Sequence, residues 1–106
     1  MKLLSRIEEI LLVAVWRLED NAYGVSIKEE IARLTGQDWT LGAVYVPLDK
    51  LTRKGLLAKK TSVPTAERGG RSKCLYRLTT LGRDSLREIR EVSRAIWEGI
   101  PDAGLK

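Results

Sequence analysis

The first strong signal along the chain is an apolar periodicity that begins after residue 5. Ser5 followed by Glu8 is the pattern of a capping box, which begins a helix. Apolar residues at helical spacing are Ile7, Ile10, Leu11, Ala14 and Leu18. Three further apolar residues are Val13, Val15 and Trp16. The predicted helix, which ends near residues 20–21, is therefore apolar on more than one face and needs cover both from its own domain and from a partner chain.

A second helix is predicted directly after the first. Tyr23-Gly24 precedes it, and Ser26 with Glu29 repeats the capping pattern. The residues expected to face inward are Ile27, Ile31 and Leu34. Gly36 is expected to end this helix, because glycine adopts the left-handed conformation that stops a helix.

The third predicted helix follows a short stretch, 37–39, that favours a strand. Thr40 caps the helix, which reaches Lys54 and stops at Gly55. Its predicted buried stripe is Val44, Leu48 and Leu51. Its predicted exposed residues are Gly42, Ala43, Tyr45, Val46, Asp49, Lys50 and Arg53. Pro47 lies inside the helix and should bend the helix axis, because proline removes a backbone donor.

The last third of the chain favours a hairpin and a final helix. Residues 56–63 and 72–78 are predicted as strands, and the glycine- and proline-containing stretch 64–71 as an exposed turn. Thr79 or Thr80 caps the helix. The apolar stripe of this helix is formed by Leu86, Ile89, Val92, Ile96 and Ile100, with Trp97 beside it. The spacing is close to a coiled-coil seam, which suits packing against another helix.

This order of elements predicts a mainly α fold with a small β-hairpin. Three helices followed by a two-stranded hairpin form a winged helix-turn-helix, and here one more helix follows. A winged helix presents its third helix and its hairpin, the wing, to DNA.

Composition excludes several classes of function. The chain of 106 residues has no histidine and one cysteine, which argues against a histidine-based catalytic triad, a zinc finger and a disulfide scaffold. We therefore expect no enzyme activity, no metal and no cofactor. The longest apolar run, residues 10–16, is far shorter than the ~20 residues that span a bilayer, so we expect a cytoplasmic location and no membrane partner.

Positive charge is concentrated in one segment. The whole chain has a net charge of +5, but residues 50–77 contain nine basic residues and one acidic residue, a net charge of +8. The segments 1–49 and 78–106 carry −3 and 0. Such a segment suits a polyanion, or alternatively a solvated face that keeps the protein soluble. Because it covers the end of the third helix and the hairpin, the predicted fold favours nucleic acid.

Three motifs resemble the PadR-type transcriptional regulators. The run 40–45, Thr-Leu-Gly-Ala-Val-Tyr, resembles the recognition helix of these regulators. Tyr23-Gly24 resembles the start of their second helix. Tyr76-Arg77-Leu78-Thr79, followed by Gly82, resembles their junction between the wing and the last helix. Val46 departs from the pattern, because a proline often follows the tyrosine directly. The resemblance covers roughly residues 3–98 and is to the short, single-domain subfamily.

The resemblance implies a homodimeric bacterial repressor that binds a pseudo-palindromic operator in double-stranded DNA. Residues 1–79 would form the DNA-binding domain, 80–100 a C-terminal dimerisation helix in the same compact unit, and 101–106 a tail. The dimer interface would contain Ile10, Val13, Trp16, Leu86, Ile89, Val92, Ile96 and Trp97. Trp16 and Trp97 would line a pocket for a small planar aromatic effector, or alternatively act as ordinary interface anchors.

The residues expected at DNA lie on two elements. They are Thr40, Gly42, Ala43, Tyr45, Val46, Lys50 and Arg53 on the third helix, and Lys59, Lys60, Arg68, Arg71 and Lys73 in the hairpin. Thr40 acts as a helix cap and suits a phosphate as well. Tyr45 either donates to a phosphate or packs partly beneath the hairpin. Val46 either touches a thymine methyl group or is a half-buried filler. The hairpin arginines reach into the minor groove or, as we favour, attract phosphates without reading bases.

The sequence thus predicts a sequence-specific transcriptional regulator. The alternative is a winged-helix module that docks a protein or RNA without operator specificity, but such a module has no need of the basic wing. Cys74 is expected to be a small buried hydrophobe rather than a redox switch, because no second thiol is present.

Overall fold

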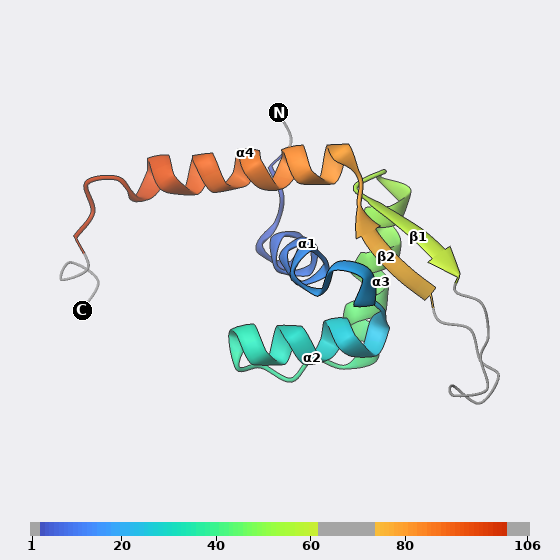
Figure 1. The fold of residues 1–106 in the computed structure, drawn as a ribbon. Helices are drawn as coiled ribbons and strands as arrows, with labels where there is room; N and C mark the ends of the chain where they lie inside the picture. Colours follow the sequence, from blue (N-terminus) through green and yellow to red (C-terminus); the bar gives the residue numbers. More distant parts are fainter. Residues whose placement is uncertain (1–2, 62–73, 102–106) are drawn as a thin grey trace.

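The fold of the protein, given by a computed structural model that describes residues 3–61 and 74–101, is three helices, a hairpin and a fourth long helix (Figure 1). The elements are α1 (Arg6–Leu18), the short 3-10 helix η1 (Glu19–Asn21), α2 (Gly24–Thr35), α3 (Leu41–Arg53), β1 (Leu57–Thr61), β2 (Cys74–Leu78) and α4 (Thr80–Trp97). This confirms the predicted mainly α fold with a small hairpin. The predicted turn 64–71 lies outside the described residues.

Side-chain caps begin three of the helices, and two of the capping residues, Ser5 and Thr40, were predicted without an alternative. The Ser5 hydroxyl accepts from the backbone N–H of Glu8 at 3.1 Å, and the Glu8 carboxylate accepts from the N–H of Ser5 at 2.9 Å. Thr40 caps α3 by accepting from the N–H of Ala43 at 3.1 Å. Of the two threonines proposed for the last helix, Thr79 is the cap. These local hydrogen bonds explain why helix starts were predictable.

Three local predictions between α1 and α3 were wrong. α2 begins at Gly24, so Ser26 lies inside the helix, where its buried hydroxyl accepts from the N–H of Tyr23 at 2.9 Å instead of capping with Glu29. Leu34 is 40% exposed and does not face the core. Residues 37–39 form no strand, because the described sheet consists of β1 and β2 alone and offers them no neighbour.

The core surrounds α1, which lies between α2 on one side and α4 on the other (Figure 1). Its largest fully buried side chains are Leu11, Leu12, Val15, Ile27, Ile31, Val44, Leu48, Leu51 and Leu57. They come from α1, α2, α3 and β1. The apolar faces of α1 are therefore largely covered by other elements of the same chain. Trp16 lies at the margin of the covered surface and is 57% exposed.

An ion cluster joins α1 to α2 outside this core. Glu30 accepts from Arg17 Nε at 2.9 Å and from Arg33 Nη2 at 2.5 Å. The hydrogen bonds from Arg33 and then from Arg17 lower the pKa of Glu30 to about 2. Glu30 therefore stays ionised and connects the two helices over a wide pH range.

The hairpin is antiparallel, with Leu57 opposite Leu78 and Lys59 opposite Tyr76. Alternation along the strands puts Leu57, Tyr76 and Leu78 on the face that packs against the core. The N–H of Tyr76 also donates to the carbonyl oxygen of Ala22 at 2.8 Å, which attaches the segment before α2 to the free edge of β2. The wing is therefore fixed to the helical core at its base.

α4 is anchored to the base of the wing by its first turn. The Thr79 N–H donates to the carbonyl oxygen of Leu56 at 3.2 Å, and the Thr79 hydroxyl donates to that of Gly55 at 2.6 Å. Gly82 is buried at this point, and a Cβ atom on it would lie 2.2 Å from the Leu56 oxygen. From there α4 crosses α1, and its C-terminal half extends away from the other helices (Figure 1).

No helix within the described ranges is long and apolar enough to span a membrane.

Replacing Gly82 tests this junction. We expect Gly82→Ala to lower the free energy of unfolding by about 1–3 kcal/mol, because the added methyl group meets backbone rather than a movable side chain. The measurement is urea unfolding followed by circular dichroism. The control is Gly42→Ala on the open face of α3, where nothing but the Thr40 hydroxyl lies within 4.0 Å and alanine should stabilise the helix by up to about 1 kcal/mol. Equal effects of the two substitutions would show that Gly82 is not sterically required.

Candidate nucleic-acid interface

α3 has one fully buried side and one open side. Val44, Leu48 and Leu51 are 0% exposed, as the spacing predicts. The exposed residues of the helix are Leu41, Gly42, Ala43, Tyr45, Val46, Asp49, Lys50 and Arg53. Pro47 is half-buried within the helix. The predicted partition of α3 is therefore confirmed, and Val46, at 65% exposure, is not a half-buried filler.

Tyr45 packs against the start of α2. A Cβ atom on Gly24 would lie 1.9 Å from the Tyr45 hydroxyl oxygen and 2.2 Å from the ring carbon that carries it. The tyrosine ring therefore crosses the first turn of α2 at a place that only glycine leaves open. Tyr45 keeps 43% of its surface exposed, so it is partly packed and still accessible.

The sequence patterns did not identify Gly24 as the residue that leaves room for the Tyr45 ring. It appeared there only as part of the Tyr23-Gly24 motif at a helix start, with no link to Tyr45. The available signal was the joint presence of two motifs, but single-sequence patterns do not show that they touch.

Tyr76 lies behind this contact, on the core-facing side of the wing. Burial first, and then the neighbouring Cys74, Tyr45 and Asp49, raise the pKa of Tyr76 well above its ordinary value. Its hydroxyl is therefore neutral at physiological pH. Cys74 is half-buried and packs against the core cluster, which is close to the predicted small buried hydrophobe.

The basic side chains of α3 differ in their partners. Lys54 is bound to α1, with its Nζ 2.6 Å from a carboxylate oxygen of Glu8. Burial raises the pKa of Glu8, but the hydrogen bonds from Lys54 and Ser5 outweigh it and the pKa is lowered. Arg53 Nη2 lies 3.9 Å from Asp49 Oδ2, a long and exposed ion pair. Lys50 is exposed on the same open side.

The two lysines predicted on the wing point to opposite faces of the hairpin. Lys59 pairs with Tyr76 and shares the face that packs against the core, whereas Lys60 pairs with Leu75 on the other face. Both are exposed. Strand alternation therefore separates them by face, although both line a second groove together with Glu19 and Asp20 of η1. Arg68, Arg71 and Lys73 lie outside the described residues.

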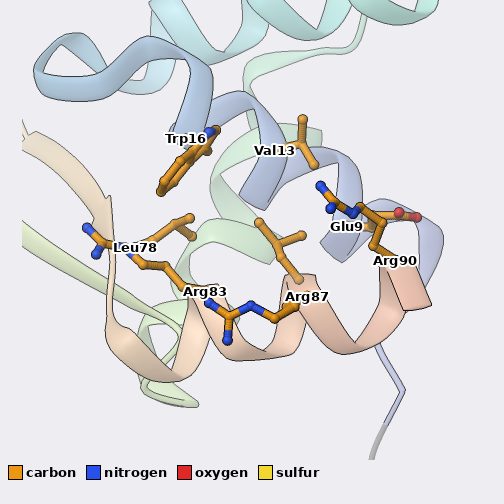
Figure 2. A pocket seen from close by; sticks show the side chains of 8 residues that line it. Glu9, Val13, Trp16, Leu78, Arg83, Arg87 and Arg90 are labelled. Carbon is orange, nitrogen blue, oxygen red and sulfur yellow. The ribbon is translucent and has the colours of Figure 1, made fainter. Parts of the chain in front are cut away.

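A groove of about 390 Å³ lies between α1 and α4 (Figure 2). It is lined by Glu9, Val13, Trp16, Leu78, Arg83, Leu86, Arg87 and Arg90. The guanidinium carbon of Arg83 is 5.5 Å from the centre of the Trp16 ring, a cation–π contact. Three residues predicted at a dimer interface, Val13, Trp16 and Leu86, thus share this groove.

The other predicted interface residues lie elsewhere. Ile10, Ile89 and Val92 are half-buried, and Ile96 and Trp97 are 63% and 50% exposed near the end of α4. Within one chain, Trp97 is not in the groove that contains Trp16, since it lies about 20 Å further along α4 than Arg83. The aromatic effector pocket stays a prediction.

The sequence model of the transcriptional regulator PadR-like family matches residues 11–88 of the chain. RosR of H. salinarum is 25% identical, with a TM-score of 0.71 over 93% of this chain and 82% of that protein. A PadR family transcription regulator of Clostridium difficile is 22% identical, with a TM-score of 0.72 over 96% of this chain and 100% of that one. A PadR-like regulator of Bacillus cereus is 18% identical, with a TM-score of 0.69 over 85% and 82%. The similarities to these last two proteins are evidence for the fold alone. No curated protein is similar enough to count as a match.

A double-mutant cycle tests the contact between Gly24 and Tyr45. We expect Gly24→Ala to lower the free energy of unfolding by about 0.5–2 kcal/mol, because the new methyl group expels the tyrosine ring. In a Tyr45→Ala background the same substitution should cost nothing, since the obstacle is gone. Thermal and urea unfolding of the four proteins supply the cycle. A cost for Gly24→Ala that is equal in both backgrounds would contradict the contact.

Proposed function

The chain belongs to the PadR-like family of transcriptional regulators, and from this premise we propose that it is a homodimeric, cytoplasmic repressor of a pseudo-palindromic operator. Regulators of this family bind DNA and are not enzymes, in agreement with the composition. The observation that carries the proposal is the open side of α3, which lies beside the basic wing on one end of the molecule.

The charge and shape of this end support duplex DNA as the ligand. Residues 50–61 include five basic side chains and no acidic one, and within the described part of the chain only Lys54 of the five has a carboxylate oxygen within 3.5 Å. The major groove is about 12 Å wide and admits a helix with one open side. A solvated face without a ligand would not require that the helix present glycine, alanine and valine to solvent.

Unsatisfied apolar surface supports the homodimer. Ile96, Trp97 and Ile100 are each about half exposed or more at the end of α4 or just past it, where the described residues supply nothing to cover them. Val13 and Trp16 line a groove on α1 that is open to solvent. A second copy in the opposite orientation brings the end of its α4 to this groove, so that each chain covers the other's apolar surface.

A symmetric pair explains how the protein selects and blocks a promoter. Two recognition helices in such a dimer bind half-sites about one helical turn apart, ~34–36 Å, so the operator has the two-fold symmetry of the protein. A dimer bound across two turns occupies the DNA that a polymerase needs.

Binding to duplex DNA is tested by titration with a labelled operator, obtained by selection from random duplexes. We expect steep salt dependence, and we expect Lys50→Ala and Lys59→Ala each to weaken binding and to reduce the salt slope by about one. Lys60→Ala, on the other face of the wing, should have a smaller effect.

The control substitution is Arg94→Ala, which removes a cation near the end of α4 that is paired with Glu91 at 3.5 Å. Structured RNA serves as the competing ligand. If RNA binds as tightly as the selected duplex, or if Arg94→Ala weakens binding as much as Lys59→Ala does, the proposed function is wrong.

The homodimer is tested by sedimentation velocity. We expect Ile96→Glu to raise the dimer dissociation constant at least about tenfold, because it places a charge in an apolar interface. Leu34→Glu, which alters an exposed leucine on α2, is the matched control and should leave the dimer intact. A wild-type chain that sediments as a monomer at tens of micromolar would exclude this assembly.

A further inference from the structure

The centre of the open side of α3 is apolar where a base-reading group would be expected. Val46 is 65% exposed, the highest value among the large hydrophobic residues in the described part of the chain. It lies two positions after Val44 and two before Leu48. Because each residue turns a helix by about 100°, Val46 points directly away from the core.

Nothing within the described residues accounts for a valine at this position. A β-branched side chain is a poor choice for an exposed helix position, because its rotamers are restricted there. The following residue, Pro47, disfavours the helical conformation of Val46 as well. If this position only faced solvent, a charged or polar residue without a branched Cβ would fit the helix better than valine.

The surroundings of Val46 allow close approach to a base pair. Gly42 and Ala43 lie one turn earlier on the same side and project little beyond the backbone. Lys50, one turn later, supplies positive charge for the phosphates that flank the groove. The first half of α3 therefore presents a small apolar surface, and the second half presents charge.

Hydrogen-bond readout has few candidates on this surface. The exposed residues between 41 and 46 are Leu41, Gly42, Ala43, Tyr45 and Val46. None has the two parallel donors with which arginine recognises guanine, or the donor and acceptor pair with which asparagine or glutamine recognises adenine. The feature of the major groove that an apolar side chain does recognise is the 5-methyl group of thymine.

We infer that Val46 reads the 5-methyl group of one thymine in each operator half-site. The inference rests on the proposed function, because it requires that α3 enters the major groove of duplex DNA. It adds the chemical identity of one base: a thymine whose methyl group contacts the two γ-methyl groups of the valine. Cytosine, which lacks the methyl group, is disfavoured at this position.

Replacement of thymine by uracil tests the inference, because uracil keeps the Watson–Crick pair and removes only the methyl group. Each thymine of the selected operator is replaced in turn by deoxyuridine, and the affinity of the full chain is measured by fluorescence anisotropy. We expect one position in each half-site at which the replacement weakens wild-type binding roughly threefold to tenfold.

The same duplexes are then titrated with Val46→Ala. This variant should bind the thymine operator about as weakly as the wild type binds the uracil operator, and it should respond little to the uracil replacement. Val25→Ala, which shortens another exposed valine on α2, is the matched control and should keep the full response to uracil. Circular dichroism checks that all three proteins are folded.

Two results would overturn the inference. If no uracil replacement weakens wild-type binding, or if Val46→Ala responds to uracil as strongly as the wild type does, the methyl group is not read by Val46, although DNA binding itself stands. If selection enriches no duplex sequence, the proposed function and this inference fall together.

Discussion

The arrangement of the proposed DNA-binding surface follows from the burial of Val44, Leu48 and Leu51. This stripe fixes the rotation of α3 about its own axis, because turning the helix would expose three aliphatic side chains at a cost of about 1.5–3 kcal/mol each. Once the rotation is fixed, the position of every other residue of α3 follows from helix geometry. The open side of α3 is thus a consequence of core packing, and Val46 at its centre is accessible for that reason.

The wing is held to the core by the buried side chains of Leu57, Tyr76 and Leu78 together with backbone contacts, and α4 is attached at its first turn. Thr79 and Gly82 bring the start of α4 against Leu56, and the N–H of Tyr76 connects the wing to Ala22. The surface proposed to bind DNA and the helix proposed to form the dimer therefore share one junction. The separation of two recognition helices in a dimer depends on the angle that this junction gives to α4.

Sequence patterns predicted what is decided locally. The caps at Ser5 and Thr40 and the buried stripe of α3 depend on residues within one or two turns, so their spacing was sufficient. Features decided by distant residues were not predictable in this way. The close approach of Tyr45 depends on a glycine in another helix, and which face of the wing each lysine takes depends on the side of the strand that packs against the core. The start of α2 is a local feature that was nevertheless misplaced, because the Ser26 hydroxyl bonds Tyr23 and Asn21 instead of capping.

Whether α3 enters the DNA groove is shown most directly by an NMR map of backbone amide perturbations in the full chain bound to its selected operator. We expect the largest changes on the open side of α3, around Ala43, Val46 and Lys50, and on β1, with little change at the end of α4. Large changes confined to the groove between α1 and α4, with α3 unaffected, would contradict this expectation.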